Sequence, residues 1–78
     1  MIFSIRIVDD SGDPVSNESV YVVESHMLGG PSQSEYTDTD GWASFEFVNH
    51  STFYGVVHVG GEEYPIRVDD GETLSITI

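Results

Sequence analysis

The sequence predicts an all-β domain, a seven-stranded antiparallel Greek-key β-sandwich over residues 1–78, and three observations support this. Apolar and polar residues alternate with a period of two, and no window of about a dozen residues sustains the 3.6-residue period of an amphipathic helix. Clusters of Gly, Asp, Asn, Ser and Pro separate the alternating segments at fairly regular spacing. A chain of 78 residues has room for one domain.

The first two strands are expected over residues 2–8 and 19–25, because the turn-forming sequence DDSGDP lies between them. In the first strand the inward face is formed by alternating large apolar residues, Phe3, Ile5 and Ile7. In the second strand both faces are apolar. Two inward sets therefore remain open there: Val20 with Val22, or Tyr21 with Val23.

The third and fourth strands are expected on either side of TDTDG, after a loop formed by HMLGGPSQ. The third covers about 33–37, and the fourth directs Ala43, Phe45 and Phe47 inward. Aspartate side chains accept hydrogen bonds from nearby backbone, and glycine adopts a positive φ at low cost. The two aspartates and the glycine are therefore expected to shape a hairpin that begins the fourth strand.

The fifth strand, residues 53–59, is apolar on both faces and is expected at the centre of a sheet. Gly60-Gly61 forms a hairpin turn before a sixth strand that carries Tyr64, Ile66 and Val68 inward. Pro65 lies among the outward residues of that strand and lacks an N–H group, which predicts an edge or a bulge. After DDGE, the seventh strand alternates cleanly, and its inward residues are Leu74, Ile76 and Ile78.

Two motifs resemble a known family. IRIVDDSGDPVSNESVYV contains an Asp-x-x-Gly-x-Pro-Val turn at residues 9–15, and YTDTDGWASFEF contains a Thr-Asp-x-Asp-Gly turn at 37–41. Both resemble carboxypeptidase regulatory-like domains, which are grouped with transthyretin-like and collagen-adhesin B-type domains among the prealbumin-like sandwiches. The resemblance implies a prealbumin- or immunoglobulin-like sandwich and a non-catalytic module that accompanies enzymes, receptors or surface assemblies. The internal Lys-Asn crosslink of adhesin-type members is excluded, since the chain contains no lysine.

Charge is the outlying property of the composition. There are 14 Asp and Glu residues against two arginines, and the formal net charge is -12. A surface of this kind repels nucleic acid and acidic membranes and attracts basic proteins. Salt adaptation is the alternative explanation, although the chain has only one alanine, Ala43, whereas halophilic proteins are usually rich in alanine.

Strand direction predicts where the acidic residues gather. Successive antiparallel strands reverse direction, so the first, third and fifth connections share one end of the molecule. We call the acidic residues of these connections, together with Trp42, the acidic end, and we expect it to bind a partner. Its members are Asp9, Asp10, Asp13, Glu18, Asp38, Asp40, Trp42, Glu62 and Glu63. For Trp42 itself, a core or half-buried position competes with a role as an interface anchor.

No catalytic motif is present, so we expect no enzyme, no catalytic residue and no cofactor. The chain has no cysteine nucleophile, no Gly-x-Ser-x-Gly elbow, no phosphate-binding glycine loop and no lysine for Schiff-base chemistry. Carboxylate pairs such as Glu62-Glu63 and Asp69-Asp70 are adjacent in sequence, so their side chains point apart instead of converging across a cleft.

Metal binding is likewise not expected. Five aspartates of the acidic end provide oxygen ligands of the type that calcium prefers, but DTDGW lacks the third acidic position and the distal glutamate of a calcium-binding loop. Hydrogen bonding to the turn backbone explains these aspartates better, and calcium at the acidic end remains the open alternative. His26 and His50 fall at the opposite end, near Asp69 and Asp70, and two loop histidines are weak evidence for zinc.

Three functions remain open. The first is a non-catalytic protein-binding module that docks on a basic protein. The second is an acidic nucleic-acid mimic that blocks the DNA- or RNA-binding groove of a nuclease or repressor; in being small and acidic, the chain resembles phage-encoded inhibitors of this kind. The third is an accessory or adhesive domain of a larger surface or virion assembly.

The partner classes and the location follow from the same features. Direct binding to nucleic acid or to a membrane is not expected, and a homodimer through edge strands is open. Met1 is followed by no basic leader and no long apolar run, so cytoplasmic location is the default, with a secreted or virion origin still open.

Overall fold

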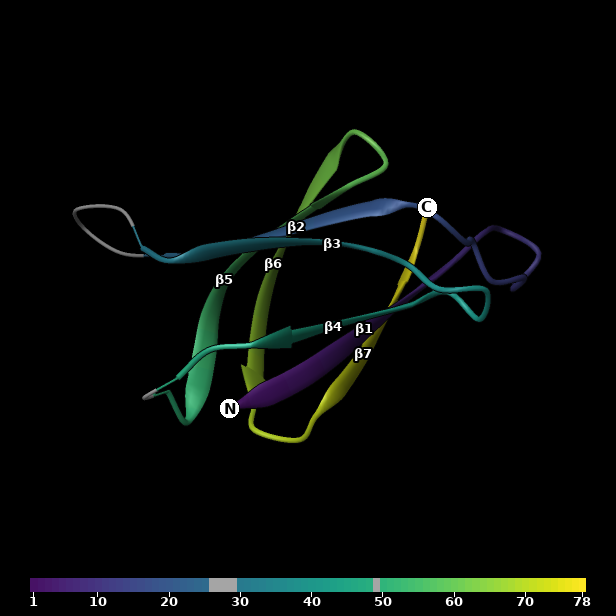
Figure 1. Ribbon diagram of the computed structural model, residues 1–78. Coiled ribbons are helices and arrows are strands. Elements are labelled where there is room, and N and C mark those ends of the chain that lie inside the picture. Colours follow the sequence, from purple (N-terminus) through teal and green to yellow (C-terminus); the bar gives the residue numbers. More distant parts are fainter. Residues whose placement is uncertain (26–29, 49) are drawn as a thin grey trace.

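The computed structural model describes residues 1–25, 30–48 and 50–78, and these form seven strands and no helix (Figure 1). The all-β prediction with seven strands is confirmed. The strands are β1 (Ile2–Val8), β2 (Ser19–Glu24), β3 (Ser32–Tyr36), β4 (Trp42–Glu46), β5 (Thr52–Val59), β6 (Glu62–Asp69) and β7 (Thr73–Thr77). They form a three-stranded sheet of order β4-β1-β7 and a four-stranded sheet of order β3-β2-β5-β6.

One apolar core is shared by the two sheets. Phe3 of β1 stacks on Phe45 of β4 at 5.5 Å between ring centroids, and it lies 5.2 Å from Phe53 of β5 in the other sheet. Phe47 closes the aromatic cluster at 4.9 Å from Phe53. The cluster therefore joins the sheets at one end of the core, and branched aliphatic residues fill the rest: Ile5, Ile7, Val20, Val22, Val57, Val59, Val68 and Ile76.

The inward residues agree with the predicted alternation. The open choice in β2 is decided for Val20 and Val22, which are fully buried, whereas Tyr21 is exposed. In β6 and β7 only Val68 and Ile76 are buried, and the other predicted inward residues pack partly exposed against the core. These two strands lie at sheet edges, where one side of each side chain has no neighbouring strand.

Strand five lies at the centre of its sheet, between β2 and β6, as predicted, and Pro65 is on edge strand β6. Gly55 explains how closely β2 and β5 approach. A Cβ atom at this position would lie 2.1 Å from the carbonyl oxygen of Val23. The sheet therefore requires glycine here.

Three expectations about topology are corrected. The sheets are not wholly antiparallel, because β1 and β7 pair in parallel. TDTDG does not form a hairpin, because β3 and β4 lie in different sheets and the turn carries the chain from one to the other. The strand order also differs from that of an immunoglobulin constant domain, in which strands 1, 2, 5 and 4 form one sheet and 3, 6 and 7 the other.

Candidate functional site

The turn between β3 and β4 is shaped by Asp38. Its carboxylate accepts hydrogen bonds from the N–H groups of Asp40 (2.9 Å) and Trp42 (3.0 Å), and its own N–H donates to the Trp42 carbonyl (2.9 Å). Gly41 has a φ of +84°, and a Cβ there would lie 2.6 Å from the Ile7 carbonyl oxygen. The predicted backbone role of this turn is confirmed.

Asp9 has the same role in the connection between β1 and β2. Its carboxylate accepts hydrogen bonds from the N–H groups of Ser11 (2.9 Å) and Asp13 (3.0 Å). The side chains of Asp10 and Asp13 are exposed and accept no hydrogen bond from any residue that the structure describes. The loop therefore uses one carboxylate to hold its shape and presents two to solvent.

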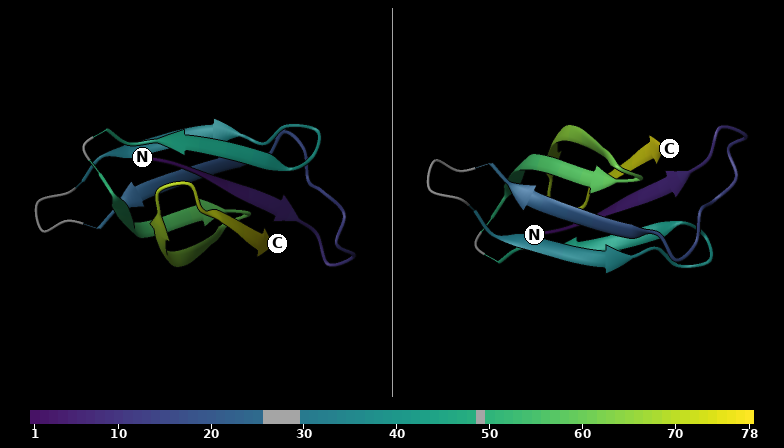
Figure 2. Two further views of the ribbon diagram at one scale, coloured as in Figure 1. Left: turned by 90° about the horizontal axis from the view of Figure 1, so that it is seen from below. Right: turned by 90° about the horizontal axis from the view of Figure 1, so that it is seen from above.

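Thr37 ties these two connections together. It is buried, and its Oγ1 donates to the Val15 carbonyl (2.7 Å) and accepts from the Glu18 N–H (2.8 Å). Its backbone carbonyl also accepts from the Asn17 N–H (2.9 Å). The sequence places Thr37 in the Thr-Asp-x-Asp-Gly motif but does not predict its burial, because a threonine beside a turn resembles a solvent-exposed one. The two connections lie at the same end of the molecule in both views of Figure 2.

The third connection that carries residues of the acidic end is the Gly60-Gly61 turn between β5 and β6, and it lies apart from the other two connections. Both glycines have positive φ, +62° and +79°. A Cβ at Gly60 would lie 3.3 Å from the Cβ of Ile78, whose N–H donates to the carbonyl of Val8 at the end of β1 (2.9 Å). The turn is thus near the end of β1, although the hairpin projects away from the other two connections (Figure 1).

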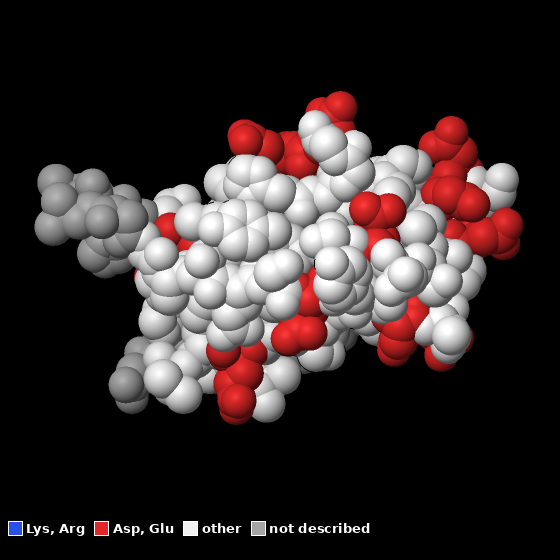
Figure 3. Space-filling view, turned by 45° about the horizontal axis from the view of Figure 1, so that its top comes forward, with Lys and Arg blue, Asp and Glu red and all other residues white. Residues whose placement is uncertain are grey.

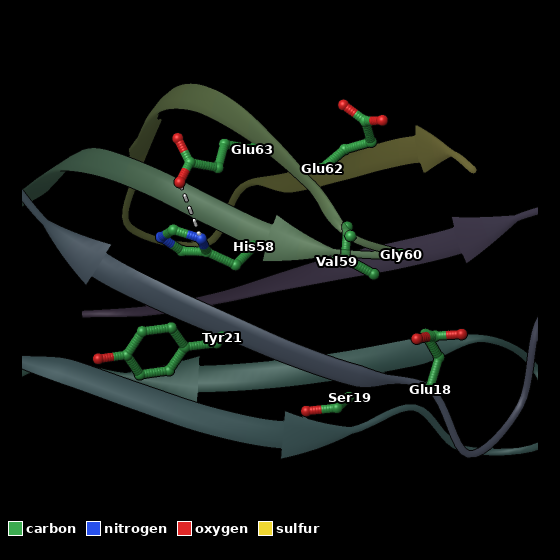
Figure 4. A pocket seen from close by; sticks show the side chains of 9 residues that line it. Glu18, Ser19, Tyr21, His58, Val59, Gly60, Glu62 and Glu63 are labelled. Atoms are coloured by element: carbon green, nitrogen blue, oxygen red, sulfur yellow. Dashed lines mark ion pairs between the residues drawn. The ribbon is translucent and has the colours of Figure 1, made fainter.

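An open groove of about 570 Å³ separates this hairpin from the beginning of β2. β2 pairs with β5 only from Tyr21 onward, so Ser19 is beyond the ladder and the strands diverge. Glu18 lies on one side of the groove, and Glu62 and Glu63 lie on the other (Figure 4). Three carboxylates of the acidic end therefore line one concave surface, and Glu18 connects it to the Thr37 contacts.

Beside the groove lies a cross-strand row of side chains that the sequence does not reveal. Tyr21 and His58 are paired across β2 and β5 with ring centroids 5.5 Å apart, and His58 pairs with Glu63 across β5 and β6. The Nδ1 atom of His58 lies 3.5 Å from a carboxylate oxygen of Glu63 (Figure 4). Only the strand register reveals this row, because its members are far apart in sequence.

Both arginines are engaged by neighbouring groups. Arg6 donates from Nε to the Asp40 carbonyl (3.0 Å) and lies over the Trp42 ring at 5.8 Å. Trp42 is half-buried on the outer face of its sheet. Arg67 lies 3.6 Å from an Asp69 carboxylate oxygen and 5.6 Å from the centre of the Tyr54 ring. Figure 3 shows acidic groups along the upper and right parts of this face and also across its lower part, and no blue group is visible.

The nine residues of the acidic end therefore fall into three classes. Asp9 and Asp38 hold turns, Trp42 packs beneath Arg6, and the remaining carboxylates are directed to solvent or to the groove. The remaining carboxylates belong to Asp10, Asp13, Glu18, Asp40, Glu62 and Glu63.

No three His, Asp or Glu side chains are grouped to hold a metal ion within the described residues. His50 contacts Glu24 through Nε2 at 2.5 Å, and its Nδ1 lies 2.8 Å from the Val48 carbonyl. His26 lies outside the described residues.

No protein-family model matches the chain, and no curated protein matches it. In the part of the chain that the structure describes, no helix has the length and apolar character needed to cross a membrane.

Proposed function

We propose that the chain is a non-catalytic protein-binding module whose acidic end docks on a basic protein surface. The observation that carries this proposal is the groove between β2 and the β5–β6 hairpin, which is lined by Glu18, Glu62 and Glu63 (Figure 4). Three carboxylates around one groove make its electrostatic potential negative, and this potential attracts a cation. Such complementarity accelerates association and selects basic partners.

The groove suits a lysine or arginine side chain of the partner. Carboxylates provide charge-assisted acceptors for ammonium or guanidinium groups, and the face of the Tyr21 ring provides a cation–π contact. The same combination occurs within the molecule at Arg67, which lies 3.6 Å from an Asp69 carboxylate oxygen and 5.6 Å from the centre of the Tyr54 ring. A partner that presents an arginine to the groove would use the same contacts.

We further propose that the two sheets form a prealbumin-like Greek-key β-sandwich, as the motif resemblance implies. The single core shared by the inward faces of both sheets supports a sandwich. The connections from β3 to β4 and from β4 to β5 cross between the sheets, which supports the Greek-key arrangement.

A matched pair of double variants tests the proposed function. Glu62→Gln with Glu63→Gln removes two carboxylates from the groove, whereas Glu35→Gln with Glu46→Gln makes the same chemical and charge change at exposed positions on β3 and β4. Each immobilised variant captures proteins from a cell extract at low salt and releases them along a salt gradient. The captured proteins are identified, and their affinities are then measured with purified material.

The groove variant should bind its partner ~3- to 10-fold more weakly than wild type, which is the size expected for two partly exposed ion pairs. The control variant should bind like wild type. Equal elution profiles for the two variants would contradict the proposal. Adding double-stranded DNA or RNA as a competitor separates the two kinds of partner: displacement of the captured protein identifies a nucleic-acid-binding partner and supports the mimic alternative.

A further inference from the structure

Four strands lie at sheet edges: β3, β4, β6 and β7. They differ in whether other groups protect their outward backbone N–H and C=O groups from pairing with another strand. An unprotected edge strand is a template for pairing with another chain, so proteins usually block it with a side chain, a proline or a charge. Three of these edges carry such a feature, and β7 does not.

The edge of β4 is blocked by side chains. Its antiparallel register with β1 directs the N–H and C=O groups of Trp42, Ser44 and Glu46 outward. Asp38 bonds both backbone groups of Trp42, and the side-chain amide of Gln33 bonds both backbone groups of Glu46. Only the backbone of Ser44 is left for another strand.

The edges of β6 and β3 are protected by other means. In β6, Pro65 removes one outward donor, and the Glu72 carboxylate accepts the Asp69 N–H at 2.7 Å. In β3, Glu35 is the cross-strand partner of buried Val20 and so lies on the core-side face of the edge. A strand added there would have to cover this carboxylate.

β7 carries none of these features. It pairs with β1 through its even-numbered residues, so Thr73, Ser75 and Thr77 direct their N–H and C=O groups away from β1. No described residue accepts from or donates to these groups. The strand, TLSIT, has no charged side chain although the chain carries a net charge of -12, and Leu74 is only partly covered by the core.

The sequence of β7 is also complementary to itself. In an antiparallel pair of two copies centred on Ser75, Thr73 faces Thr77, Leu74 faces Ile76, and Ser75 faces Ser75. Hydroxyl residues then meet across the outer face and branched aliphatic residues across the core face, which are favourable cross-strand pairs. The three outward residues of each copy fall at the hydrogen-bonded positions, so the pairing satisfies all their backbone groups.

We propose that β7 is a self-association site, at which two copies pair antiparallel about a two-fold axis through Ser75. The product is one continuous six-stranded sheet of order β4-β1-β7-β7-β1-β4. Glu72 of one copy would lie opposite Ile78 of the other copy, so the pairing does not place the two Glu72 side chains opposite each other. A contact through one short strand is a small interface, so the dimer is weak and forms at high protein concentration.

This inference is independent of the proposed function, and salt dependence separates the two. Two molecules of charge -12 repel each other, so added salt strengthens the dimer, whereas it weakens docking on a basic partner. From ~0.05 to ~1 M NaCl, the dimer should tighten by at least ~5-fold, because the Debye length falls from more than ~10 Å to ~3 Å.

Sedimentation equilibrium of the whole chain tests the proposal with two matched variants, Ser75→Lys on β7 and Ser34→Lys on β3. Both serines are exposed and lie at the centre of an edge strand, so the charge change is the same. Ser75→Lys should abolish the dimer by placing two lysines opposite each other, and Ser34→Lys should leave it intact. Loss of the dimer in Ser34→Lys but not in Ser75→Lys would overturn the proposal. A wild-type protein that stays monomeric at millimolar concentration and ~1 M NaCl would overturn it as well.

A crosslinking experiment tests the register directly. The chain contains no cysteine, so Ser75→Cys and Ser34→Cys each introduce a single thiol. With oxidised glutathione as the oxidant, Ser75→Cys should give a disulfide-linked dimer well before Ser34→Cys does, because only residue 75 faces its own copy. Equal rates of crosslinking would show that the contact is not at β7.

Discussion

Replacing Thr37 by valine is expected to destabilise the protein, because the Thr37 side chain joins the β1–β2 connection to the β3–β4 connection. Valine has nearly the shape of threonine, but it can neither donate to the Val15 carbonyl nor accept from the Glu18 N–H. Thr37 is the one buried polar side chain among the described residues, so bulk water does not reach its backbone partners to replace the missing hydroxyl group.

The magnitude follows from these two hydrogen bonds. Each contributes about 1.5 kcal/mol, because its partly buried backbone partner is left without a replacement when the hydroxyl group is removed. The added methyl group returns up to about 0.8 kcal/mol through burial. We therefore expect a loss of about 2 kcal/mol in the free energy of unfolding, which is a large part of the ~4–12 kcal/mol that a domain of this size has.

Urea unfolding followed by circular dichroism measures this loss, and thermal unfolding should show a Tm lower by about 8–16 °C. Thr37→Ser retains the hydroxyl and is expected to lose only about 1 kcal/mol, for one buried methyl group. Thr39→Val is the matched control, because Thr39 is exposed in the same turn and its side chain makes no hydrogen bond among the described residues. If Thr37→Val unfolds like Thr39→Val, or if the serine variant is as unstable as valine, the hydroxyl does not hold the connections together.

Two further predictions concern the turn and the core. Gly41→Ala should lower the free energy of unfolding by about 3 kcal/mol, since it adds a clash with the Ile7 carbonyl to the strain of a positive φ. Gly71→Ala has nearly the same φ but open space around the added methyl group, and it should cost only about 1 kcal/mol. Equal losses in urea unfolding would mean that the clash at residue 41 does not contribute. Phe3→Ala should lower the free energy of unfolding by about 3–5 kcal/mol in urea unfolding, because Phe3 is fully buried. Ile2→Ala, exposed on the same strand, should stay within about 0.5 kcal/mol of wild type. Equal losses for the two variants would contradict the assignment of the core.

The strands could be predicted from the sequence because their side-chain period is local. Alternation of Phe3, Ile5 and Ile7 with polar residues specifies a strand and its inward face without knowledge of its neighbours. Pairing could not be predicted in the same way. The parallel contact of β1 with β7 joins segments at opposite ends of the chain, and no turn between them fixes their register.

The candidate site was predicted in part for the same reason. Turn chemistry at Asp38 and Gly41 is local, and it was found. The groove depends on where β2 leaves the ladder with β5, and the Tyr21-His58-Glu63 row depends on the register of three strands. Sequence alone places neither, because both are set by tertiary pairing of distant segments.

The two proposed contacts lie on different sheets, and their charges couple them. The groove belongs to the four-stranded sheet, whereas β7 is the edge of the three-stranded sheet. A basic partner in the groove lowers the net negative charge of each copy and therefore lowers the repulsion that opposes pairing at β7. By linkage, pairing at β7 must then raise the affinity of the groove for a cation by the same factor, since each copy adds its negative potential to the other.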